Sequence, residues 1–208
     1  MQGAQAENKS RGIGRYSLAL AKNIVKYRGE HEIILALNGA FEDTIEPIRG
    51  VFQNKLPQTS IRVWLPVSPC HHLEPENDWR RGASEKLYEA FLKNLEPDIV
   101  VVTSLFEGLG QDAVTSIGQM TDLTIAVVLY DLIPFLNPVP YLENPAVKRW
   151  YDEKVFFLQK ANLLLSISES SRQEALSYLN FSKEKVVNIS TDADPQFIRK
   201  KYSKNEAL

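Results

Sequence analysis

The sequence predicts one α/β domain built on a doubly wound, mainly parallel sheet. Short runs rich in β-branched residues alternate with longer segments of helical periodicity, and this alternation is typical of strand–helix–strand crossovers. Several of the short runs are apolar at consecutive positions, as expected for parallel strands that helices cover on both faces. The order of the segments resembles a Rossmann-like half-domain.

Composition agrees with this fold class and excludes several functions. The chain has 208 residues, of which 44% are hydrophobic and 24% are charged, a globular composition for one domain. Its formal net charge of −2 gives no basic field for a nucleic-acid partner, and its single cysteine excludes an intramolecular disulfide. The apolar runs are far shorter than the ~20 residues that span a bilayer, and the polar N-terminal segment does not look like a secretory signal. We therefore expect a cytoplasmic protein.

The expected strands and helices follow one another along the chain. Strands are expected at 31–38, 61–65, 98–104, 124–131, 163–168 and 186–190. Helices are expected at 12–28, 78–95, 145–161 and 169–180, with N-caps at Asn77, Asn144 and Ser168. The first helix has an apolar side formed by Tyr16, Leu20, Ile24 and Tyr27. The second helix repeats apolar residues at four-residue steps, namely Trp79, Ala83, Leu87, Phe91 and Leu95.

The two ends of the chain depart from the regular alternation. A strand should feed the first helix, yet the segment before that helix, MQGAQAENKS, is polar. We therefore expect that the first strand of the fold is absent or that a later segment takes its place. Periodicity is lost again toward the C-terminus, so residues 1–190 are predicted to form the domain and 191–208 an exit linker.

The start of the first helix is a candidate anion site. Gly12, Ile13, Gly14 and Arg15 begin this helix, and the glycines allow close approach of a ligand to backbone amides at the positive end of the helix dipole. A nucleotide-sugar diphosphate or a phosphorylated acceptor would suit the site, and a flexible loop is the structural alternative. A nicotinamide site is disfavoured because Ser17 stands where the third glycine of that motif would fall.

Polar residues follow three of the expected strands at their carboxyl ends, where open α/β sheets bind ligands. These residues are Ser104 and Glu107, then Tyr130 and Asp131, then Ser168 and Glu169. Glu107 would accept hydrogen bonds from sugar hydroxyls or be a solvated loop carboxylate. Asp131 would orient a hydroxyl or act as a base, or else bond its own turn backbone. Ser168 is expected to cap the helix that follows it.

Two further motifs are not expected to bind metal. Cys70, His71, His72 and Glu74 lie in a proline-rich loop, where adjacent side chains point apart and lack the usual spacing of zinc ligands. Asp192 and Asp194 form a D-x-D motif that is followed by Pro195, and a turn explains this motif.

Taken together, the segments resemble the N-terminal domain of family 4 (group 1) retaining glycosyltransferases of the GT-B fold, and in particular bacterial mannosyltransferase-type members that build polysaccharides and lipopolysaccharide. The resemblance covers nearly the whole chain. It is carried by QGAQ, SRGIGRYSLALAK, HEIILALNG, NDWRR, SLFEGLGQDAVTSIG, LYDLIPFLNPVPYL, WYDEKV, SISESSRQEA and VVNISTDADPQF, in that order.

The resemblance implies an acceptor-side domain that faces a nucleotide-sugar-binding domain across a cleft. It implies GDP-mannose or a similar donor, a glycan or lipid-linked sugar as acceptor, and no metal cofactor. The loop at Gly12 and Gly14 would approach the donor diphosphate, and Asp131 would stand near the transferred sugar, beside Tyr130 where many members carry histidine. We expect the chain to be the incomplete, inactive half of a transferase. A non-catalytic binding module is the alternative.

Membrane contact is left open by the sequence. Arg15, Lys22, Lys26 and Arg28 give the first helix a basic character, and basic helices of this kind can lie on anionic lipid. A solvated helix face explains the same charges. The resemblance adds a peripheral location at the inner face of the plasma membrane as a second expectation.

Overall fold

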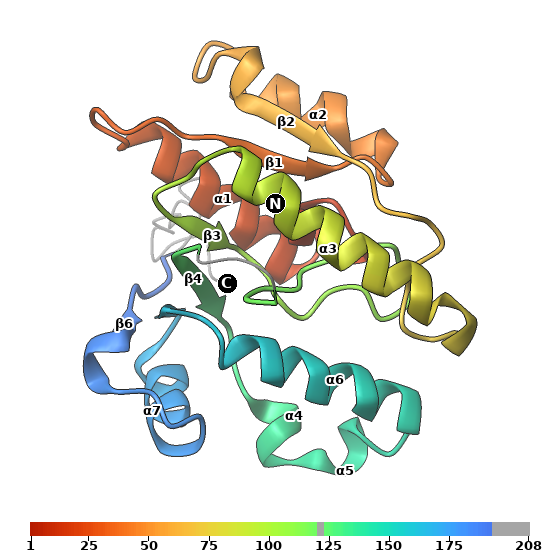
Figure 1. Cartoon of the computed structure of the whole chain (residues 1–208). Coiled ribbons are helices and arrows are strands. Elements are labelled where there is room, and N and C mark those ends of the chain that lie inside the picture. The colour runs from red at the N-terminus through yellow and green to blue at the C-terminus, as the bar shows by residue number, and fades with distance from the viewer. Residues whose placement is uncertain (120–122, 193–208) are drawn as a thin grey trace, which may run out of the picture.

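The computed structural model describes residues 1–119 and 123–192 and has the predicted parallel α/β architecture (Figure 1). Its strands are β1 (Leu35–Asn38), β2 (Ile61–Trp64), β3 (Val100–Val102), β4 (Ile125–Leu129), β5 (Leu163–Ser166) and β6 (Val186–Asn188). All six predicted strands are confirmed, each shorter than its apolar run. Every pair is parallel, in the orders β1-β2 and β3-β4-β5-β6.

The four predicted helices are confirmed, and the structure adds three more. The helices are α1 (Gly12–Lys26), α2 (Glu42–Phe52), α3 (Asp78–Asn94), α4 (Ile133–Leu136), α5 (Pro138–Tyr141), α6 (Pro145–Leu158) and α7 (Glu169–Tyr178). Asn144 caps α6 by accepting from the amides of Ala146 and Val147. Asn77 precedes α3, but its side chain makes no capping hydrogen bond. Sequence analysis missed α2, which contains Pro47, a residue that normally argues against a helix interior.

The segment before α1 forms two 3₁₀ turns, η1 (Gln2–Ala4) and η2 (Glu7–Ser10). No strand lies in residues 1–11, as predicted. In the part of the chain that the structure describes, β1 pairs only with β2, and β3 pairs only with β4. The sheet is therefore divided into a two-stranded part and a four-stranded part between β1 and β3. Of the predicted linker, residues 193–208 lie outside the described residues.

Each part of the sheet has its own core. All five residues of β4 are buried, and Ile125, Val127 and Leu129 of this strand lie in one cluster with Tyr151, Val155 and Leu158 of α6. The strands β1 and β2 share a second cluster with α1 and α2. Figure 1 shows α2 with the two-stranded part at one end of the molecule and α7 with β6 at the other.

The most buried residues of α1 and α3 differ from the apolar positions that helical periodicity indicates. The buried residues of α1 are Gly14, Ser17, Ala21 and Val25, whereas Tyr27 is 72% exposed. Small side chains face inward because α1 packs closely against η1 and η2. The buried residues of α3 are Arg81, Ser84, Tyr88, Glu89 and Leu92. Polar groups are buried on α3 because loop amides need acceptors there: the amide of Val67 donates to Ser84, and that of Gln119 donates to Glu89.

Candidate functional site at the carboxyl edge of the sheet

The structure brings several predicted residues together where β3 and β4 end. Ser104 and Glu107 follow β3, and Tyr130 follows β4. Ser17 of α1 joins them, since its Oγ lies 3.3 Å from the Tyr130 hydroxyl. Gly3 of η1 completes the group: a Cβ atom there would lie 2.7 Å from the Cβ of Ser104 and 3.2 Å from Glu107 Oε1. Only a glycine lets η1 approach this closely.

Glu107 is part of the interior of this edge. Its exposed fraction is 4%, and its Oε1 accepts a hydrogen bond of 2.7 Å from Ser104 Oγ. The interpretation as a solvated loop carboxylate is therefore wrong. The loop is held by its backbone as well: Trp150 Nε1 donates to the Glu107 carbonyl at 3.1 Å. Gly108 has φ +90°, and a Cβ there would lie 2.2 Å from the Ala113 carbonyl oxygen, so this turn requires glycine.

Tyr130 links three elements through its hydroxyl. The hydroxyl donates to the Thr103 carbonyl at 3.0 Å and lies 3.4 Å from the Ile13 carbonyl at the start of α1. The ring makes an edge-to-face contact with Tyr16 at 5.5 Å. Burial raises the pKa of Tyr130 to about 12, so the hydroxyl stays protonated at neutral pH and acts as a hydrogen-bond donor.

Asp131 lies at the rim rather than in the interior. Its side chain is exposed, and its Oδ1 accepts from the amide of Ile133 at 3.0 Å. This is the turn interaction that the sequence offered as the structural alternative. This hydrogen bond to Ile133, the first residue of α4, fixes the direction of the Asp131 carboxylate. The residue between them, Leu132, is buried.

The start of α1 is open to solvent. Gly12 is exposed, and a Cβ there would meet nothing within 4 Å. Gly14 is buried, Ile13 is half-buried, and Arg15 is exposed with its Nε donating to the Ser10 carbonyl at 3.1 Å. The N-cap residue Arg11 makes no side-chain capping bond. The Arg11 side chain therefore leaves the first amides of the helix without a cap.

The third predicted pair, Ser168 and Glu169, lies at the N-terminus of α7. Ser168 caps this helix, accepting from the amide of Ser171 at 3.1 Å, which confirms the predicted cap. Ser171 Oγ donates to the Tyr130 carbonyl and so ties α7 to the end of β4. Glu169 is exposed; it accepts from Gln173 at 2.6 Å and pairs with Arg172 at 3.2 Å. The Gln173 hydrogen bond lowers the pKa of Glu169.

Sequence analysis missed Gln2 and Gln5, whose hydrogen bonds hold η1 against β1 and the Val114 segment. Gln5 exchanges two hydrogen bonds with the Asn38 backbone, of 3.0 and 2.9 Å. Gln2 Oε1 accepts from Asn38 Nδ2 at 2.9 Å and from the Val114 amide at 2.8 Å. Both glutamines are buried. Their presence in a polar segment gave no local sign of burial, because their partners lie far along the chain.

The cysteine and histidines of the proline-rich loop are engaged in packing. His72 is 1% exposed; its Nδ1 lies 2.8 Å from the Gly108 carbonyl oxygen and its Nε2 lies 2.9 Å from Glu153 Oε1. Burial raises the pKa of the Cys70 thiol to about 12. No three histidine, cysteine or acidic side chains gather as a metal site within residues 1–119 and 123–192. Asp194 of the D-x-D motif lies outside the described residues.

No helix in the described part of the chain has the length and apolar character needed to cross a membrane. Neither a protein-family model nor a solved structure matches the sequence.

Curated relatives match along nearly the whole chain. The sequence is 31% identical over 205 residues to a serotype-specific mannosyltransferase WbdA of Escherichia coli, which covers 98% of this chain and 24% of that protein. Two further WbdA proteins of Escherichia coli are 28% identical over 186 residues, covering 88% of this chain and 23% of each protein. The chain thus spans about a quarter of the length of these relatives. Along nearly its whole length, the chain is therefore similar to one segment of the WbdA mannosyltransferases.

Proposed function

We propose that this chain is the acceptor-binding half of a mannosyltransferase-like hexosyltransferase. The complete enzyme would transfer mannose, or a similar sugar, from GDP-mannose or a related nucleotide-sugar to a glycan or lipid-linked acceptor. The observation that carries the proposal is the similarity to mannosyltransferases over 98% of the chain. Residues 1–190 would form the acceptor-side domain, and 191–208 would lead to the donor-binding part.

The carboxyl edge supplies the groups that such a site needs. The exposed carboxylate of Asp131, held by its turn, would orient the acceptor hydroxyl and act as the catalytic group of this half. Ser104 and Glu107 would form the polar wall of the acceptor site. Tyr130 would support this wall as a neutral donor, and Ser168 with Glu169 would bound the site on the α7 side.

The start of α1 would face the donor. Amides at Gly12, Ile13 and Gly14, with the exposed guanidinium of Arg15, present positive potential to a diphosphate. Stabilising a departing diphosphate requires donors aimed at it as its charge develops. In this proposal, α1 contributes one side of that arrangement and the donor-binding part contributes the other.

Acceptor binding by the 208-residue chain tests the proposal. Isothermal titration with an α-mannose oligosaccharide should give saturable binding, and Asp131→Asn should weaken it about tenfold or more, because the amide keeps the turn but loses the charge. Asp152→Asn is the matched control, since Asp152 is an exposed residue of α6 paired with Lys148, and it should bind as the unchanged chain does. A folded chain that binds no mannoside, or equal binding by both variants, would contradict the proposal.

The same proposal places the protein at the inner face of the plasma membrane by peripheral contact. Arg15, Lys22 and Lys26 are exposed on α1, and Lys26 Nζ lies 4.7 Å from the ring centre of the exposed Tyr27. This combination suits an anionic interface. Co-sedimentation with vesicles containing phosphatidylglycerol should exceed that with phosphatidylcholine vesicles, and Lys22→Glu with Lys26→Glu should abolish the difference.

A further inference from the structure

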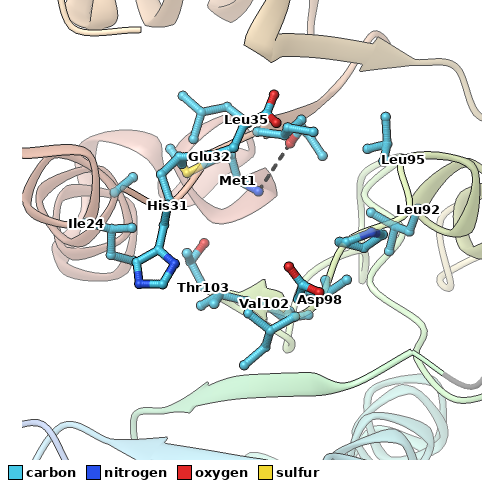
Figure 2. A pocket seen from close by; sticks show the side chains of 18 of the residues that line it. Met1, Ile24, His31, Glu32, Leu35, Leu92, Leu95, Asp98, Val102 and Thr103 are labelled. Atoms are coloured by element: carbon cyan, nitrogen blue, oxygen red, sulfur yellow. Dashed lines mark hydrogen bonds between the residues drawn. The ribbon is translucent and has the colours of Figure 1, made fainter. Parts of the chain in front are cut away.

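The space between strands β1 and β3, where the sheet is divided, is not filled by any described strand. A cavity of about 880 Å³ lies there, and Figure 2 shows it from close by. It is lined on one side by residues 31–36, which lead into and include half of β1, and on the other side by residues 95–104, which include β3. In the described residues these are the two strand edges at which the sheet is divided.

Helices cover this cavity on both faces, as they would cover a strand inside a parallel sheet. Ile24 of α1 lies on one side of it, and Leu92 of α3 with the adjacent Leu95 lies on the other (Figure 2). Leu35 and Val102 project from the two strands. The walls therefore present apolar side chains above and below, with two rows of backbone amides and carbonyls at the edges, and His31, Glu32 and Asp98 also line the cavity. This pattern fits an extended polypeptide with apolar side chains on both faces.

The direction of the missing element follows from η1. This turn contacts the end of β1 through Gln5 and Asn38, and it contacts Ser104, just past the end of β3, through Gly3. Both strands therefore run toward η1. The Met1 amine also lies within hydrogen-bond reach of the edge, 3.4 Å from the Ala36 carbonyl of β1. A segment that passed through the cavity parallel to both strands would arrive at Met1.

We propose that this cavity is the binding site of one extended, apolar β-strand segment that is joined through its C-terminal end to Met1 and pairs in parallel with β1 and β3. At ~3.3 Å per residue, about five or six residues would run beside residues 31–36. The proposal is independent of the proposed transferase function, because it rests on sheet edges and not on the carboxyl-edge residues.

The surroundings of Met1 favour a peptide bond at this point. Burial lowers the pKa of the Met1 amino group to about 6, which means that the cavity disfavours a charged ammonium. An amide in the same place would be neutral and would still donate to Ala36. A strand from a second copy of the chain would not be joined to Met1, whose amine lies at this edge.

The test extends the full chain before Met1 with DIVVVTS, a copy of residues 98–104. The matched control carries DIPVPTS, which has the same length and charge but lacks two amide donors. The strand extension should raise the Tm by about 6 °C or more over the control. It should also slow amide exchange at least tenfold at residues 33–37 and 100–103 and reduce the fluorescence of added 8-anilinonaphthalene-1-sulfonate.

Two further measurements decide the result if an extension impairs folding. The free peptides DIVVVTS and DIPVPTS, acetylated and amidated, are added to the unchanged chain; the first should protect the same amides and the second should not. Equal Tm and exchange for both extensions, or protection elsewhere in the molecule, would overturn the proposal. So would concentration-dependent dimerisation that already protects residues 33–37 in the unchanged chain.

Discussion

In the 208-residue chain, the amino group of Met1 lies inside the fold, 3.4 Å from the Ala36 carbonyl oxygen. Burial lowers its pKa from 8.0 to about 6, although the nearby Glu107 carboxylate opposes the shift. Between these two pH values the unfolded chain binds more protons at this group than the folded chain. The stability that this group contributes is therefore fully present above about pH 8 and is lost as the pH falls through 6.

Acetylation of the Met1 amine should remove this pH dependence. The free energy of unfolding of the unmodified chain should fall by up to about 3 kcal/mol more between pH 8.5 and 5.5 than that of the acetylated chain, since one pKa unit corresponds to about 1.4 kcal/mol. Urea unfolding at several pH values measures the difference. The histidines are common to both proteins. Parallel pH profiles would contradict the assignment.

Gly3 and Gly12 should respond differently to the addition of one methyl group. Gly3→Ala forces a Cβ to within 2.7 Å of the Ser104 Cβ, and overpacking of this kind typically costs about 1–3 kcal/mol. Gly12→Ala meets nothing within 4 Å and should change stability by less than about 0.5 kcal/mol. Thermal unfolding of the two variants measures the change in stability that each substitution causes. Equal destabilisation would show that η1 does not pack as described.

At the scale of elements, the loop at residues 105–110 is held from several sides. His72 contacts the Gly108 carbonyl with its backbone amide and its ring, at 3.1 and 2.8 Å. Thr115 Oγ1 donates to the Leu105 carbonyl at 2.6 Å, and Trp150 donates to Glu107 from α6. The loop that carries Glu107 is therefore positioned by α6 and by segments far from it in the sequence.

Trp150→Phe should loosen this loop while leaving the ring packing in place. The phenyl ring can still contact Phe106 and Tyr151, but the hydrogen bond to the Glu107 carbonyl is lost, at a cost of about 1 kcal/mol. Mannoside affinity should fall several-fold as well. Trp79→Phe is the control, because Trp79 is 66% exposed on α3, and it should leave stability and affinity unchanged. Equal stability and equal mannoside affinity of the two variants would contradict a role of this loop in the acceptor site.

At the scale of the whole molecule, we propose the carboxyl edge as one wall of the acceptor site. The described residues place α1 and the ends of β3, β4 and β5 along a single edge. In the proposed function, this edge holds the acceptor and a separate donor-binding part holds the nucleotide diphosphate. We therefore expect acceptor binding and sugar transfer to separate experimentally.

The 208-residue chain should bind mannoside without transferring mannose. Incubation with radiolabelled GDP-mannose and an oligosaccharide acceptor should give product below detection, because only one side of the diphosphate would meet stabilising donors. Measured turnover by the chain alone would contradict this expectation. Absence of transfer from a longer protein that carries this segment, together with retained mannoside binding, would favour the non-catalytic binding module.

Local patterns along the chain predict the kind and order of the main elements. Apolar runs located all six strands, and caps such as Asn144 and Ser168 located helix starts. These features depend on residues close together in the chain. Pro47 hid α2 because its local signal opposes a helix, while tertiary packing of Ile48 and Phe52 holds that helix in place.

Which residues face inward, and which gather at the carboxyl edge, depends on contacts between distant segments. The buried side of α1 is its small-residue side, Glu107 is interior while Asp131 caps its own turn, and Gln2 and Gln5 bind partners more than thirty positions away. The cavity beside β1 is equally invisible in the sequence. The reason is that periodicity records how apolar each neighbourhood is, whereas close approach and strand pairing depend on contacts between segments that the chain brings together only on folding.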